Sequence, residues 1–138
     1  MAFEQTLTTS FKQEILLGVH DLDTDTLKLA LFTANASLNA DTTIYASANE
    51  VSGTGYVAGG NTLTGVTVLT SGTTAYVDFA DSIWNPANFT ARGALIYNAS
   101  KSNKAVAVLD FGSDKTTTTS FTVQMPTNAA DSALIRIA

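Results

Sequence analysis

The sequence contains no cysteine, which excludes a disulfide framework, a thiolate metal site and a thiol nucleophile. Charge is also scarce: 14% of the 138 residues are charged, and seven basic against twelve acidic side chains give a formal net charge of -5. This sign disfavours a protein that gathers phosphate groups, so we expect no nucleic-acid partner. No apolar run approaches the ~20 residues of a membrane span, and the start lacks the pattern of a secretory signal. We therefore expect a soluble protein, made in the cytoplasm, with no membrane partner.

Apolar residues make up 45% of the chain, enough to bury a core, and the length fits one domain. We divide the chain into an N-terminal arm with a short helix, residues 1–25, and a β-sandwich domain, residues 26–138. The arm is assigned because only its pattern is helical, and two turns of helix need a larger body on which to dock.

The helix is expected over residues 10–17, where Phe11, Ile15 and Leu16 continue the spacing that begins at Leu7. Ser10 followed three residues later by glutamine matches a capping box at its start. The glycine at position 18 suits a left-handed residue that ends the helix. This short amphipathic segment either packs on its own domain or reaches a neighbour.

The rest of the chain alternates with a period of two, which is typical of strands, and threonine is abundant throughout. Expected strands cover residues 27–32, 63–69, 75–79, 94–97, 105–111, 116–124 and 134–137. Residues 71–72 form a hairpin turn, Pro126 opens another turn, and residues 35–61 form a long loop with room for one edge strand. The fold class expected is all-β: an antiparallel β-sandwich or jelly roll of about seven to eight strands.

Two motifs match known sites in part. Gly53, Gly55 and Ala58 fit a dinucleotide-binding fingerprint, but no buried strand precedes them and no helix follows, so a flexible loop is the better interpretation. Asp21, Asp23 and Asp25 resemble the first half of a calcium loop, yet the glycine and glutamate of the second half are missing. A complete calcium site is excluded, while weak calcium binding by these carboxylates stays open beside a solvated acidic connector.

His20 is the one histidine in the chain, so a multi-histidine metal site within one chain is excluded. No serine lies in a nucleophile elbow, and we interpret His20 as a hydrogen-bond donor to the last carbonyls of the helix. We expect no enzyme: no catalytic residue, no cofactor-binding residue and no metal ligand is assigned, and no cofactor is implied.

Trp84 and Phe89 flank a proline-containing turn. Two aromatics on a turn form a sugar platform or an interface anchor, or they cap the end of the sandwich core, and we favour core capping. Arg92 follows this turn and is placed to pair with Asp78 or Asp81, or with a partner subunit.

The chain as a whole resembles small virion structural proteins of tailed bacteriophages. The resemblance extends over nearly the whole length and is carried by residues 1–18, 25–32, 49–56 and 91–97. Within that group the sequence is most similar to capsid decoration, or cement, proteins, which are compact β-sandwich or jelly-roll domains on the outside of an icosahedral shell.

The resemblance implies a non-enzymatic protein that stabilises the capsid by clamping adjacent major capsid protein subunits. It implies two partners, the major capsid protein and the protein itself as a homodimer or homotrimer, and a place on the outer capsid surface after a time in the host cytoplasm. The candidate interface residues are Phe3, Leu7, Phe11, Trp84 and Arg92.

Two alternatives stay open. A tail, neck or fibre component of the virion would share the β-rich, threonine-rich composition. A carbohydrate-binding β-sandwich module would use Trp84, Tyr76 or Tyr97 as stacking platforms.

Overall fold

The structure is a computed structural model that describes residues 3–125 and 133–137. It is mostly β, with 46% of residues in strands and 9% helical. The elements in chain order are β1 (Thr6–Leu7), α1 (Thr9–Leu16), β2 (Leu27–Phe32), β3 (Asn61–Thr62), β4 (Thr67–Ser71), β5 (Thr74–Asp78), β6 (Ser82–Trp84), β7 (Phe89–Asn98), the 3-10 helix η1 (Ala99–Lys101), β8 (Lys104–Thr117), β9 (Phe121–Val123) and β10 (Ile135–Ile137). The expected all-β, sandwich-like class is confirmed, with ten strands among the described residues rather than seven or eight.

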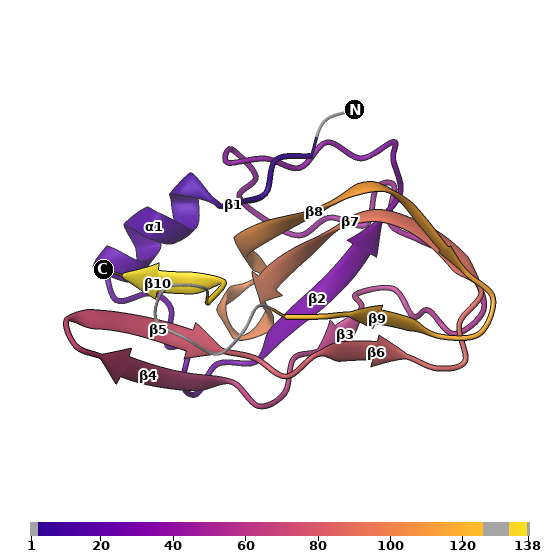
Figure 1. Ribbon diagram of the computed structural model, residues 1–138. Coiled ribbons are helices and arrows are strands. Elements are labelled where there is room, and N and C mark those ends of the chain that lie inside the picture. Colours follow the sequence, from indigo (N-terminus) through magenta and orange to yellow (C-terminus); the bar gives the residue numbers. More distant parts are fainter. Residues whose placement is uncertain (1–2, 126–132, 138) are drawn as a thin grey trace.

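The described residues form three antiparallel sheets. The central sheet has the strand order β1-β8-β7-β2-β3, and two smaller sheets have the orders β10-β5-β4 and β6-β9. Figure 1 shows the two smaller sheets along one side of the central sheet, with α1 at the end where β10 and the β4–β5 hairpin lie. The layers therefore stack as in a sandwich, with one side divided between two short sheets.

Strand β2 begins and ends where its leucine alternation predicts. Leu27, Leu29 and Leu31 are at most 1% exposed and face the core shared with α1 and the two small sheets. Ala30 and Phe32 point to the opposite face and join a second, smaller apolar cluster. Because both faces of β2 are covered, its burial is nearly continuous, as for a strand inside a layered sheet.

The second apolar cluster is closed by the long connection between β2 and β3. Ala36, Leu38 and Tyr45 of this connection pack on the face of the central sheet that the small sheets leave free. Between Phe32 and Asn61 the chain makes isolated bridges rather than a strand. The region expected as a long loop thus serves as the missing layer on this side.

Helix α1 begins two residues earlier than the capping-box pattern predicts. The hydroxyl of Thr8 accepts from the Phe11 N–H at 3.2 Å and supplies the N-cap, so the role assigned to Ser10 is wrong. The end is as expected: Gly18 has φ +74°, and the Val19 N–H donates to the Glu14 carbonyl at 2.9 Å. This six-to-one hydrogen bond completes a Schellman motif.

The segment assigned as an arm lies against the rest of the protein. Strand β1 pairs with β8, and Phe11 is 2% exposed within the main core. The amphipathic stripe is narrower than the spacing predicts, because Leu16 is 86% exposed.

Two other expectations can be compared with the structure. The β4–β5 hairpin turns at Gly72 as expected, with φ +60° there. The strand expected over residues 116–124 is divided between the end of β8 and β9. Pro126 lies outside the described residues. No helix in the described part of the chain is long and apolar enough to cross a membrane.

Candidate functional site

A buried polar network joins α1 to the start of β2 and to η1. His20 Nε2 donates to Glu14 Oε1 at 2.9 Å, and Asn98 Nδ2 lies 3.0 Å from His20 Nδ1. The amide oxygen of Asn98 accepts from the Ser100 N–H, so its nitrogen faces the ring and His20 carries its proton on Nε2. The expected bond from His20 to the helix carbonyls is therefore wrong. The imidazole lies between the side chains of Glu14 and Asn98 and so links α1 to the end of β7.

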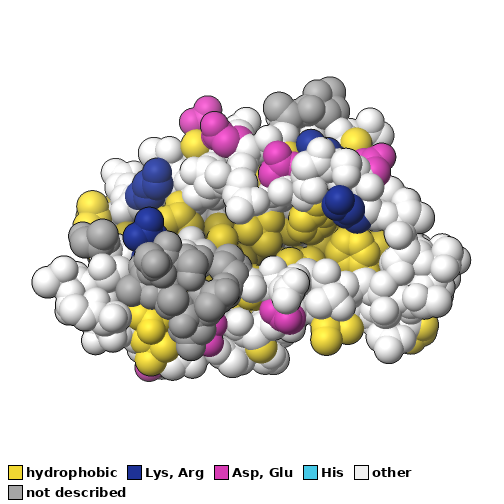
Figure 2. Space-filling model, in the orientation of Figure 1, with side chains coloured by type: hydrophobic (Ala, Val, Ile, Leu, Met, Phe, Trp, Pro, Cys, Tyr) yellow, Lys and Arg dark blue, Asp and Glu magenta, His cyan; other side chains and the backbone are white. Residues whose placement is uncertain are grey.

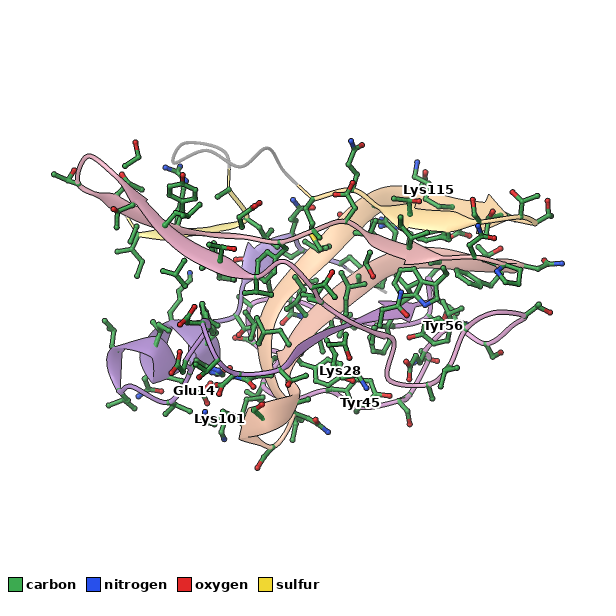
Figure 3. The ribbon with its side chains drawn as sticks, turned by 90° about the horizontal axis from the view of Figure 1, so that it is seen from below. Glu14, Lys28, Tyr45, Tyr56, Lys101 and Lys115 are labelled. Carbon is green, nitrogen blue, oxygen red and sulfur yellow. The ribbon has the colours of Figure 1, made fainter. Side chains whose placement is uncertain are left out.

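Asp25 is the other centre of this network. Its carboxylate accepts from Lys101 Nζ at 2.8 Å and from Asn98 Nδ2 at 2.8 Å. Burial opposes ionisation, but these hydrogen bonds outweigh it and lower the pKa of Asp25 to about 2. Figure 3 shows Glu14 and Lys101 near each other on the α1 side of the molecule. The charges of the network are paired within the protein.

Asp21 and Asp25 of the acidic connector have separate roles. Asp21 Oδ1 accepts from the Asp23 N–H at 3.1 Å and from the Thr24 N–H at 3.3 Å, while Asp25 turns toward Lys101. Within residues 3–125 and 133–137, no group of three or more histidine, cysteine, aspartate or glutamate side chains is arranged to hold a metal ion. The connector is ordered by hydrogen bonds between Asp21 and its own backbone.

A second polar cluster surrounds Glu50. One carboxylate oxygen accepts from the Tyr45 hydroxyl at 2.6 Å, and the other accepts from the Tyr56 hydroxyl and from the Gly59 N–H at 2.8 Å. The Tyr56 oxygen in turn accepts from the Leu31 N–H of β2 at 2.9 Å. The carboxylate therefore ties the long loop to the open edge of the central sheet.

We call this cluster the Glu50 clasp, because the carboxylate accepts hydrogen bonds that hold the loop in place. Burial and the neighbouring carboxylate raise the pKa of both the Tyr45 and the Tyr56 hydroxyl, so both stay protonated as donors. Tyr97 stacks on Tyr45 with ring centroids 4.5 Å apart and donates to the Gly59 carbonyl at 2.7 Å. Sequence analysis missed Glu50, because a single acid in a glycine-rich loop carries no periodic signal.

The residues predicted to form an interface are distributed over several places. Phe3 is half-buried on the second apolar cluster, with the Arg92 guanidinium 5.3 Å from its ring centroid. Arg92 also pairs with Asp110, whose pKa this guanidinium lowers. The expected pairing of Arg92 with Asp78 or Asp81 is wrong, because Asp110 lies on the neighbouring strand and is the nearer carboxylate.

Trp84 and Phe11 lie inside the molecule. Trp84 is 3% exposed and packs against Tyr56, Phe89 and Phe121, so the interpretation as a core cap is confirmed. Phe11 contacts the main core, and Leu7 packs against it from its margin. In this conformation Phe11 and Trp84 contact the protein's own core rather than solvent, and the contact of all five candidate residues with a partner stays a prediction.

The glycine-rich stretch does not form a nucleotide site. Gly53 and Gly55 approach the backbone of Asn88 and Pro86 so closely that a side-chain carbon on either would overlap a carbonyl oxygen. No helix follows them. These glycines let the loop cross the turn between β6 and β7.

A groove of about 970 Å³ lies between α1 and the sheet β10-β5-β4. Its walls are mostly apolar and include Leu7, Ile15, Leu16, Val68, Val77 and Ile137. Leu16 on its rim is 86% exposed and Ile137 is 60% exposed, while the neighbouring Leu17 is 70% exposed. A small domain seldom exposes neighbouring large apolar side chains unless something binds there. We call this surface the α1 groove.

Charges of both signs border the α1 groove. Lys12 and Arg136 line it, as do Asp21 and Asp23, and none of the four forms an ion pair with another described residue. A second groove, of about 410 Å³, lies between β8 and β9 and is lined by Phe111, Phe121 and Lys115 among others. Figure 2 shows a band of hydrophobic side chains across the face of the molecule that is seen in Figure 1.

Apolar walls with a mixed-charge rim are typical of a surface that binds protein. The α1 groove is therefore the candidate functional site. In comparisons with known proteins, no family model matches this chain, and no curated protein or solved structure matches it.

Proposed function

We propose that this protein is a non-enzymatic structural component of a tailed-phage virion, which decorates the capsid and clamps adjacent major capsid protein subunits. The resemblance of the sequence to decoration proteins motivates the proposal. The observation that carries the binding role is the α1 groove, where Leu16 and Ile137 stand exposed beside an apolar cavity of about 970 Å³.

A clamp of this kind needs a rigid body and a modest contact surface. The buried networks around Asn98 and Glu50 fix the connections of the central sheet and supply the rigidity. Copies bound to neighbouring shell subunits raise one another's effective concentration, so a single apolar patch on each copy is sufficient. Self-association into a homodimer or homotrimer would match the local symmetry axes of a shell.

A tail, neck or fibre role is the alternative, since it needs the same rigid β framework. The carbohydrate-binding alternative is weaker, because Trp84 and Tyr97 are at most 3% exposed and cannot stack on a sugar. Of the three predicted platforms, this leaves only Tyr76, which is half-buried on β5.

Two measurements test the location. Quantitative mass spectrometry of purified virions of the phage that encodes the chain should find a copy number near that of the major capsid protein. A few copies per particle would favour a tail or neck component, and absence from virions would overturn the proposal. Electron cryomicroscopy of the same particles should place the protein on the outer shell.

The binding surface is tested with a double variant, Leu16→Asp with Leu17→Asp. Both side chains are exposed, so the fold should be kept while binding to shells assembled without the protein falls at least roughly tenfold, as expected when apolar anchors become charged. Val57→Asp is the matched control, because Val57 is 75% exposed but lies on the long loop. Equal binding by the double variant and the control would exclude the α1 groove as the contact.

A further inference from the structure

Strand β4 is an edge strand with an unusual composition for its position. It is the longest edge strand in the described part of the chain, with five residues, whereas β1 and β3 have two and β6, β9 and β10 have three. Its sequence Thr-Val-Leu-Thr-Ser contains no charge and no proline. Its pairing with β5 runs through five residue pairs without a bulge. Soluble proteins usually interrupt such an edge with lysine, proline or a bulge, because its free backbone groups recruit another strand.

Two other edges in the described part of the chain, those of β8 and β2, are protected. Beyond its pairing with β1, strand β8 carries Asp110, Asp114 and Lys115, and its register with β7 is interrupted near Gly93. The free edge of β2 is covered by the long loop, whose Val51 N–H donates to the Leu31 carbonyl at 2.9 Å. Outside the ladder with β5, no described residue hydrogen-bonds to a backbone group of β4. Figure 1 shows β4 at the outer margin of the molecule.

The geometry points to a second copy of this chain as the partner of β4: we infer that the protein dimerises by antiparallel pairing of β4 with β4 of another molecule. A contact of this kind is isologous and closes as a two-fold dimer. Pairing β4 with β8 of another copy would instead place carboxylates against an uncharged strand and would leave a free edge on each molecule. The two three-stranded sheets would then form one continuous sheet.

The register of the hairpin fixes the register of this dimer. Ser71 and Thr74 flank the two-residue turn, where a hydrogen-bonded pair is required, so the alternating ladder directs the N–H and C=O groups of Val68 and Thr70 away from β5. Pairing Val68 with Thr70 of the second copy satisfies these groups on both strands. Leu69 then lies opposite Leu69 of the other molecule, on the two-fold axis, in a non-hydrogen-bonded pair.

The inference specifies the contact for the self-association in the proposed function, but it concerns purified protein and does not require a capsid. Failure of shell binding would leave it standing, and a monomeric protein that binds shells would refute it alone.

Sedimentation velocity of the purified full chain, over a concentration range up to about 100 µM, tests the association; dissociation constants weaker than this indicate contacts of little strength. The wild type should dimerise. Thr70→Lys should weaken the dimer at least roughly tenfold, since it places two charges at the paired edges. Thr122→Lys is the matched control, because Thr122 is also exposed, on the edge strand β9. A monomeric wild type, or an equal effect of the two substitutions, would overturn the inference.

The absence of cysteine allows a second, positive test. In Leu69→Cys, the paired cysteines would have Cα atoms about 4.5 Å apart, which is within the range of a disulfide. Mild oxidation should convert this variant to a covalent dimer, while Ile83→Cys, at an exposed position of β6, should stay monomeric on a denaturing gel. Equal cross-linking of the two variants would contradict pairing through β4.

Discussion

Two sheet edges of this protein differ: the edge of β2 is covered by other parts of the chain, and the edge of β4 is exposed. The edge of β2 in the central sheet is closed by the long loop: the Val51 N–H donates to the Leu31 carbonyl at 2.9 Å, and the Tyr56 hydroxyl accepts from the Leu31 N–H. The edge of β4 has no such cover, and three of its five residues are threonine or serine exposed to solvent.

The difference follows from what each strand buries. The leucines of β2 are at most 1% exposed and belong to the main core. Backbone groups of β2 left without hydrogen-bond partners, or water at this edge, would therefore destabilise the whole domain. Strand β4 carries no buried residue, so its edge can stay free without exposing the core. The edge of β2, on which the core depends, is thus covered. The edge of β4 is free to bind another strand without loss of core stability.

Gly60 and Gly72 give the largest expected contrast between the two regions. A Cβ at Gly60, where φ is +79°, would lie 1.8 Å from the Leu29 carbonyl oxygen, whereas a Cβ at Gly72, where φ is +60°, meets nothing within 4 Å. Gly60→Ala must push the loop off β2 and should destabilise the protein by about 3 kcal/mol or more. Gly72→Ala should cost about 1 kcal/mol, the strain of a left-handed alanine.

Urea unfolding followed by circular dichroism measures both changes in the free energy of unfolding. Since the substitutions are chemically identical and both sites have positive φ, the difference between them reports the close approach of the loop to the strand. Equal losses would show that the loop does not hold the edge of β2 in this way.

Glu50→Ala should have the next largest effect. It leaves the hydroxyls of Tyr45 and Tyr56 and the N–H of Gly59 without their acceptor, and we expect a loss of about 2 to 3 kcal/mol. Asp114→Ala is the matched control, because Asp114 is exposed near the end of β8, and it should change stability by less than about 0.5 kcal/mol. Hydrogen exchange should also speed up at Leu31 in Glu50→Ala, and unchanged protection there would show that Tyr56 holds the edge without the carboxylate.

The layered β framework could be predicted because strands give a local pattern of alternating side chains in the sequence. The alternation at residues 27–32 identifies a strand with the observed bounds, and Gly72 marks a hairpin with the observed turn. The helix start was wrong because Thr8 and Ser10 both suit an N-cap. Thr8 takes the role because it also sits beside β8, where its hydroxyl reaches the Ala105 carbonyl.

The candidate site could not be predicted in the same way. Leu16 fits the apolar stripe of the helix, and only the position of α1 across the groove from β10 shows that Leu16 lies on an open rim. The Glu50 clasp joins the loop to β2 through Tyr56 and Leu31, which are 25 positions apart in the sequence. Contacts set by tertiary packing leave no periodic trace in a single sequence.

Acid titration of the network around Asp25 should give the smallest effect, at the point where the chain enters β2. The hydrogen bonds from Lys101 and Asn98 lower the pKa of Asp25 from 3.8 to about 2. A lowered pKa means that the folded state favours the carboxylate, so this stabilisation is present above about pH 4 and is lost as the pH falls toward 2. Asp25→Asn should cost about 1 to 2 kcal/mol at neutral pH, because it replaces charged hydrogen bonds by neutral ones.

The free energy of unfolding of wild type and Asp25→Asn should therefore converge as the pH is lowered from 4 to 2, which urea titrations at each pH would measure. Asp23→Asn is the matched control, since Asp23 is exposed in the same connector, and its curve should run parallel to that of the wild type. A constant separation between the curves of wild type and Asp25→Asn would mean that protonation of Asp25 leaves the free energy of unfolding unchanged. The entry to β2 would then be held by packing rather than by charge, and the protected edge would not depend on pH.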